Sequence, residues 1–119
     1  MPGKIALVGS GEYLPEMQDL EEWLLTDTPP RYVQLATAAS LEGEESLRRW
    51  HDWGARAAER RGVEQVGSDV RTRQDAENAD YSEAISGAGL IYLSGGNPKP
   101  LARTLIDTPV WEAIHRAWR

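Results

Sequence analysis

Short apolar runs that alternate with longer amphipathic segments are the feature that most constrains how this chain can fold. Strands that are covered by helices on both faces have such runs, because the parallel sheet that they form is buried on both sides. One run is short and more polar than the others, so we expect it nearer a sheet edge. The four predicted strands, this polar one third, are Lys4–Gly9, Arg31–Thr37, Val63–Gly67 and Gly89–Leu93.

The segments between these runs show helical spacing of apolar residues. Gly62 stands where a helix C-cap glycine is expected, and Thr108-Pro109 fits the N-cap and first position of a last helix. The predicted helices begin near Pro15, cover Glu44–Arg61 and Tyr81–Ser86, and continue over Leu101–Ile106 and from Pro109 onward. The alternation predicts a three-layer α/β/α sandwich with a mostly parallel sheet. Because no strand follows the last helix, we expect residues 1–119 to form a single, incomplete α/β domain, apparently truncated.

Composition excludes several classes of function. The sequence has no cysteine, which excludes disulfides, thiolate catalysis and cysteine-based zinc sites. The net charge of −6 argues against a nucleic-acid partner, and the Arg48-Arg49 and Arg60-Arg61 pairs are interpreted as solvated helix faces. No apolar run approaches the roughly 20 residues that span a bilayer. The short N-terminal run does not fit a signal peptide, so we expect a cytoplasmic protein without membrane contact.

Three loops follow predicted strands at the ends where parallel α/β sheets bind ligands. They are Gly9–Leu14, Thr37–Gly43 and Ser94–Pro98. In the last loop, Gly95 and Gly96 permit a tight turn that can aim backbone N–H groups at an oxyanion or a carboxylate. Asn97 can add its side-chain amide, and Ser94 completes the candidate binding loop. An ordinary strand-to-helix turn is the alternative for the same residues.

The two other loops carry weaker signals. Gly9, Ser10, Gly11 and Glu12 resemble the start of a dinucleotide fingerprint, but Leu14 replaces the last glycine of that pattern. We therefore predict no cofactor and assign these four residues to the lining of the cleft. Thr37 and Ala38 are small enough for a ligand to approach closely, and they suit a plain loop equally well.

Catalytic and metal-binding motifs are missing from the sequence. His51 and His115 lie within predicted helices and not at strand ends, and no H-E-x-x-H pattern occurs. The G-x-S-x-G pattern of a nucleophile elbow is also missing. The sequence therefore predicts no catalytic residue and no metal ligand.

Several segments taken together resemble a known family. They are Ala6–Met17, Leu35–Ala39 with Glu42-Gly43, Trp53-Gly54, Asp75-Ala76 and Ala88–Pro98. Their order and spacing are similar to the N-terminal half of the S51 serine peptidases, which include dipeptidase E and cyanophycinase. This resemblance covers essentially the whole chain. It implies the class I glutamine-amidotransferase-like fold, a flavodoxin-like sandwich.

The resemblance also implies an activity, namely serine-type hydrolysis of small peptides, often with an aspartyl group beside the scissile bond. In that family the Gly-Gly loop lies beside the nucleophile, so the resemblance assigns oxyanion and substrate binding to Gly95, Gly96 and Asn97. The family's nucleophile stands in a G-x-S-A-G-A elbow, on the strand after the helix that here reaches Arg119. That elbow is not in this sequence. A chain without the nucleophile keeps only binding and oxyanion effects.

Two functional hypotheses follow. In the first, the chain is one half of an S51-type peptidase, inactive alone, whose nucleophile comes from a complementary C-terminal half. In the second, it is a non-catalytic α/β module that binds a small acidic molecule or a protein partner. Either way, a sheet that lacks its next strand has an unpaired edge, which predicts a homo-oligomer or a complementary partner.

Overall fold

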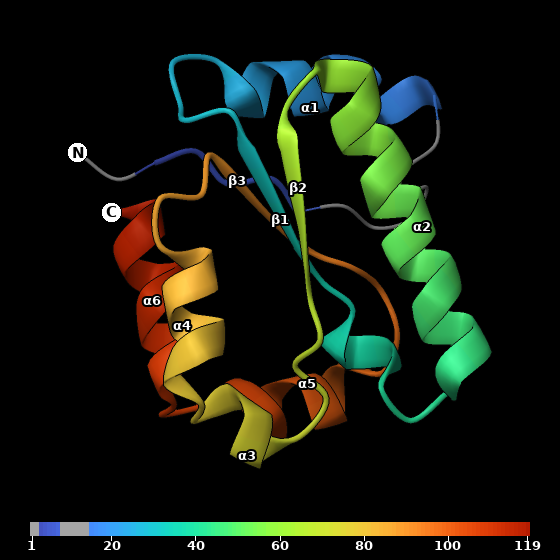
Figure 1. The fold of residues 1–119 in the computed structure, drawn as a ribbon, viewed down its shortest axis with the longest axis vertical. Helices are drawn as coiled ribbons and strands as arrows, with labels where there is room; N and C mark the ends of the chain where they lie inside the picture. Colours follow the sequence, from blue (N-terminus) through green and yellow to red (C-terminus); the bar gives the residue numbers. More distant parts are fainter. Residues whose placement is uncertain (1–2, 8–14) are drawn as a thin grey trace.

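Three parallel strands form the centre of the molecule (Figure 1). The computed structural model describes residues 3–7 and 15–119. Strand β1 (Arg31–Leu35) lies between β2 (Glu64–Ser68) and β3 (Leu90–Leu93), and Val33 pairs with Val66 on one side and Ile91 on the other. The predicted edge position of the more polar strand is therefore confirmed, since β2 lies at one edge of the sheet.

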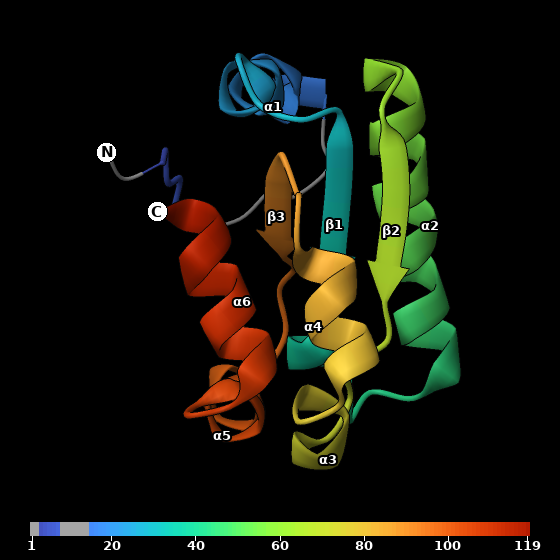
Figure 2. The same ribbon diagram turned by 60° about the vertical axis from the view of Figure 1, so that its left-hand side comes forward.

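Helices cover both faces of this sheet, as predicted. Figures 1 and 2 show α2 (Glu44–Arg61) on one side and α4 (Ala79–Ile85) and α6 (Pro109–Trp118) on the other, while α1 (Gln18–Leu25) lies across the end where the strands begin. The 3₁₀ turn η1 (Pro15–Met17) precedes α1. Three short elements gather near the carboxyl ends of the strands: η2 (Thr37–Ala39), α3 (Arg73–Ala76) and α5 (Pro98–Leu105). The prediction of a mostly parallel α/β/α sandwich is confirmed.

Alternation along β1 divides the core between the two faces. Val33 and Leu35 are fully buried and belong to a cluster with Ile85, Val110 and Ile114 from α4 and α6. On the opposite face Tyr32 packs with Leu90 and with Ala57 and Ala58 of α2. Gln34 also lies in β1 and is fully buried. A polar residue therefore stands in the middle of the central strand.

Local sequence signals fix several helix ends. Gly62 has φ +66°, the left-handed conformation that a C-cap glycine supplies without steric cost. The Thr108 hydroxyl accepts a hydrogen bond from the Trp111 N–H at 3.2 Å, so the predicted N-cap of α6 is confirmed. The polar stretch before α4 holds an additional short helix, α3, which begins with a capping box between Thr72 and Asp75.

The N-terminal apolar run differs from its prediction as a central strand. Residues 4–7 form no strand, and the side chains of Ile5 and Leu7 are 67% and 92% exposed. The central position in the described sheet is taken by β1, which already has a partner strand on each side. The rest of this predicted strand, Val8 and Gly9, lies outside the described residues. Across the described parts of the chain, no helix has the length and apolarity needed to cross a membrane.

Candidate functional site

The loop that follows β3 packs directly on the backbone that follows β1. The Asn97 N–H donates a hydrogen bond to the carbonyl of Ala38 at 2.8 Å, and the Ser94 N–H donates to Leu35 at 3.1 Å. Gly96 has φ +152°. A Cβ atom at Gly96 would lie 2.8 Å from the Ala39 nitrogen and closer still to the Ala38 carbonyl group. Only glycine allows the two loops to approach this closely.

Ser94 is a buried member of this loop, with only 2% of its surface exposed. Its hydroxyl donates to the Leu35 carbonyl at 3.2 Å and accepts from the Gln34 side-chain amide at 3.0 Å. These bonds use the hydroxyl to hold β3 against β1. The predicted contribution of Ser94 to ligand binding can therefore come from its backbone, or from fixing the position of the two glycines that follow it.

Gly96 and Asn97 are exposed at the mouth of the loop, and Gly95 is half-buried. Asn97 is the N-cap of α5, and its Oδ1 accepts from the Lys99 N–H at 3.1 Å. This cap orients the side chain, so its Oδ1 is already engaged at the helix terminus. The structure thus brings Ser94, Gly95, Gly96 and Asn97 together as one short segment between a strand and a helix.

The predicted cleft-lining residues after β1 are both buried. Thr37 and Ala38 are 1% and 5% exposed. The Thr37 hydroxyl donates to the Val70 carbonyl at 2.7 Å, which ties η2 to the segment after β2. Ala38 contributes its carbonyl to the bond with Asn97. The other predicted cleft residues, Gly9, Ser10, Gly11 and Glu12, lie outside the described residues.

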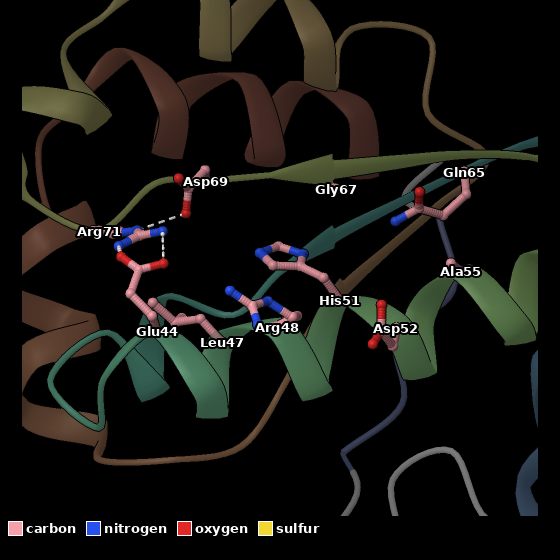
Figure 3. Close-up of a pocket in the computed structure, with 10 residues that line it drawn as sticks. All are labelled: Glu44, Leu47, Arg48, His51, Asp52, Ala55, Gln65, Gly67, Asp69 and Arg71. Atoms are coloured by element: carbon pink, nitrogen blue, oxygen red, sulfur yellow. Dashed lines mark hydrogen bonds and ion pairs between the residues drawn. The ribbon is translucent and has the colours of Figure 1, made fainter.

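A groove that the sequence did not predict runs between α2 and the edge strand β2 (Figure 3). It has a volume of about 450 Å³, and its wall includes His51, Asp52 and Arg48 on α2. Gly67 lies opposite His51, and a Cβ at that position would stand 3.0 Å from the imidazole Nδ1. A histidine on a helix and a glycine in an edge strand carry no joint signal in the sequence, because nothing in it sets them face to face.

Arg71 closes one end of the groove in a network of ion pairs (Figure 3). Its guanidinium binds both carboxylate oxygens of Glu44, and its Nε donates to Asp69 at 2.7 Å. The hydrogen bonds from Arg71 hold the pKa of Glu44 below its usual value. Glu44 is exposed and Arg71 and Asp69 are partly exposed to solvent, so their pairing adds little to stability.

His51 is half-buried beside this network, and its Nδ1 lies 3.0 Å from Oε1 of Gln34. Burial lowers the pKa of the imidazole, and Asp69 and Asp52 oppose the shift. The structure confirms the predicted place of His51 on a helix, but its imidazole lies beside Gln34 and Gly67, close to the carboxyl ends of β1 and β2. Its contact with the central strand was not predicted.

Metal and nucleophilic chemistry have no assembled centre in the described part of the chain. No group of three or more histidine and carboxylate side chains lies close enough there to hold a metal ion. Ser94 has no histidine partner, since its hydroxyl bonds to Leu35 and Gln34. What the described residues do offer is a fixed backbone loop at the carboxyl end of a parallel sheet, where such folds bind ligands.

The fold as a whole is shared with a peptidase. One matching solved structure is the crystal structure of a peptidase from an acI-B1 Actinobacterium, 41% identical in sequence with a TM-score of 0.94. The match covers 99% of this chain and 50% of that chain, so the sequence spans half the length of that protein. No protein-family model matches the sequence, and no curated protein matches it. The chain therefore has the fold of half a peptidase chain.

Proposed function

We propose that this chain forms the substrate-binding half of a serine-type peptidase of family S51 that hydrolyses small, aspartyl-containing peptides. The observation that carries the proposal is the 41% identity to a peptidase over 99% of the chain. The family and the substrate class come from the resemblance of the ordered segments, above all Ala88–Pro98.

The glycine loop supports this role through its fixed geometry. In acyl transfer, an oxyanion hole works because its N–H donors are held in place before charge develops. Gly96 is exposed, and its position is set by backbone hydrogen bonds from Ser94 to Leu35 at the end of β1 and from Asn97 to Ala38 of η2. In the described structure the Gly96 N–H makes no backbone hydrogen bond of its own. It is therefore our preferred donor to the oxyanion or to a substrate carboxylate.

We further propose that the 119-residue chain does not hydrolyse peptides alone. The sequence contains no G-x-S-x-G elbow, and a serine peptidase without its nucleophile retains only its binding and oxyanion effects. In the complete enzyme a complementary C-terminal half would supply the serine, the histidine and the acidic residue. Such a half would pack against the outer edge of β3, which has no partner strand among the described residues.

A fusion tests the peptidase proposal directly. This chain would be joined to the part of the acI-B1 peptidase that it does not cover, and hydrolysis of aspartyl dipeptides would be followed by chromatography. We expect activity in the fusion, none in the 119-residue chain, and a large loss in the fusion carrying Gly96→Ala. A folded fusion without activity, next to an active parent peptidase, would contradict the proposal.

The second candidate function is a non-catalytic module that binds a small acidic molecule or a protein and assembles through α6. Trp111 and Trp118 are 42% and 36% exposed and, with His115, share the outer face of that helix. Its inner face carries Val110, Ala113 and Ile114. Exposed tryptophans on one helix face are typical of contact surfaces.

Sedimentation distinguishes the two candidates. The second candidate predicts dimers at micromolar concentration that Trp111→Glu dissociates, whereas substitution of the exposed Glu59 on α2 leaves them intact. Heat on titration with aspartyl dipeptides, without any hydrolysis by the 119-residue chain, is expected under both candidates. A stable monomer that binds no peptide would remove this candidate.

A further inference from the structure

A chain of polar side chains, half-buried at His51 and buried at Gln34 and Ser94, connects the groove on α2 to the glycine loop. His51 lies 3.0 Å from Oε1 of Gln34, and Nε2 of Gln34 donates to the Ser94 hydroxyl at 3.0 Å. Gln34 is fully buried and Ser94 nearly so. Buried polar groups cost free energy unless they are hydrogen-bonded, so this arrangement has to be satisfied at every atom.

The direction of each hydrogen bond follows from one fixed acceptor. The backbone carbonyl of Trp50 can only accept, and Nε2 of Gln34 donates to it at 2.9 Å. The amide oxygen of Gln34 must then face His51, and because this oxygen can only accept, Nδ1 of His51 must carry the proton. The Ser94 hydroxyl accepts a hydrogen bond from the second N–H of the Gln34 amide and donates its own O–H to the Leu35 carbonyl at 3.2 Å.

Two glycines make room for these side chains. A Cβ at Gly54 of α2 would lie 2.9 Å from Oε1 of Gln34, and a Cβ at Gly67 of β2 would lie 3.0 Å from Nδ1 of His51. Both positions are tighter than ordinary van der Waals contact. The backbone of α2 and of β2 therefore lies as close to the Gln34 and His51 side chains as packing allows, and the Gln34 amide has little freedom to rotate. We call the hydrogen-bonded series His51–Gln34–Ser94 the relay.

We propose that Gln34 is a positioning residue for the Ser94–Asn97 loop, and that His51, as its Nδ1–H tautomer, fixes the orientation of the Gln34 amide. Gln34 acts through Ser94, whose backbone and hydroxyl both anchor to Leu35 immediately before the glycines. The loop's role in binding rests on the proposed peptidase function. The relay itself is a property of the 119-residue chain, so either proposal can fail while the other stands.

The groups that face His51 come from both walls of the groove. They are Glu44, Arg48 and Asp52 on α2, and Asp69 and Arg71 after β2. Protonation of the imidazole at Nε2 leaves the Nδ1–H donor in place, so the relay should persist in mildly acidic solution. A change of tautomer, by contrast, would set two acceptors against each other.

Two substitutions at His51 separate the relay from simple packing. Asparagine can place an amide N–H near the position of Nδ1, whereas glutamine places its amide near the position of Nε2. We therefore expect His51→Asn to preserve the loop and His51→Gln to loosen it. The readout is amide hydrogen exchange at Ser94 and Asn97, whose N–H groups make the two bonds that hold the loop.

The expected result is a loss of protection of about tenfold at Ser94 and Asn97 in His51→Gln, and less than about twofold in His51→Asn. The Trp111 amide, which bonds to Thr108 on the other side of the sheet, should keep its protection in both variants. Gln34→Met keeps the side-chain volume and removes the amide that bonds to Trp50, His51 and Ser94, so it should loosen the loop at least as much as His51→Gln does.

Nitrogen-15 NMR of the imidazole gives the decisive spectroscopic signature. At neutral pH the wild-type chain should show a neutral His51 with the proton on Nδ1. A proton on Nε2 would overturn the proposal, as would equal exchange rates at Ser94 and Asn97 in the two His51 variants. If Gln34→Met does not fold, the tautomer and the His51 pair still decide the question.

Discussion

Replacing Gly96 with alanine should release the glycine loop from the loop after β1. The new methyl group would collide with the backbone of Ala38 and Ala39, where neither neighbour is a flexible side chain. Overpacking of this kind costs about 1–3 kcal/mol, and the 2.8 Å bond from Asn97 to Ala38 contributes about 1 kcal/mol more. We therefore expect Gly96→Ala to lower the free energy of unfolding by about 2–4 kcal/mol.

Urea unfolding followed by tryptophan fluorescence measures this loss, and Gly62→Ala is the matched control. Gly62 also has a positive φ, of +66°, but a Cβ there meets nothing within 4 Å. The control therefore isolates backbone strain, which costs about 1–2 kcal/mol for a left-handed residue. If Gly96→Ala loses no more stability than Gly62→Ala, the close approach of the two loops is not what requires glycine at this position.

Three further predictions concern charged groups. Glu21 is 2% exposed, and burial raises the pKa of its carboxyl group. Because this carboxyl ionises less readily in the folded protein than in the unfolded chain, the free energy of unfolding should fall as the pH rises above about 4.5. Glu21→Gln should therefore be about 1 kcal/mol more stable than the unsubstituted chain at pH 7. Thermal unfolding over a series of pH values should show this advantage disappear near pH 4, and the exposed control Glu59→Gln should not show it. Hydrogen bonds from the backbone N–H groups of Arg71 and Thr72 lower the pKa of Asp75. Asp75→Ala should therefore lower the free energy of unfolding by about 1 kcal/mol at neutral pH and by progressively less as the pH falls below about 4. A loss of stability that stays constant with pH would contradict the capping role. Arg71→Ala should lower the free energy of unfolding, measured by urea unfolding, by less than about 1 kcal/mol, and by still less at roughly 1 M salt, because its ion pairs are open to solvent. A large loss of stability would show that the ion-pair network is structural.

The sheet and its helices could be predicted because their signals are local. The predicted strands Arg31–Thr37 and Gly89–Leu93 contain β1 and β3, although β1 ends at Leu35 and Thr37 begins η2. Gly62 and Thr108 mark helix ends as their chemistry requires. The prediction was wrong at residues 4–7, where the same kind of apolar run forms no strand. A run of this kind states only that burial is favourable, and which strands flank it depends on the rest of the fold.

The candidate site was only partly predictable for a related reason. Gly95 and Gly96 are recognisable from their place after a buried strand, and the contact of Gly96 with Ala38 gives that pattern a physical cause. The relay through Gln34 was not predictable, because its partners are 16, 17 and 60 residues away in sequence. Such contacts exist only once α2 and β3 have packed against β1.

The contacts that fix the glycine loop also bear on why the two functional hypotheses need not compete. Ser94, Gly96 and Asn97 are held by Leu35 and Ala38, which belong to this same chain. The loop geometry therefore does not depend on a complementary half, whereas the attack on a peptide bond does, because it requires a nucleophile. Binding and hydrolysis should consequently be separable: the chain alone should bind a small acidic peptide weakly, and only the completed protein should cleave it. If the chain alone binds no such peptide while the active fusion does, specificity resides in the complementary half and the glycine loop serves the oxyanion alone.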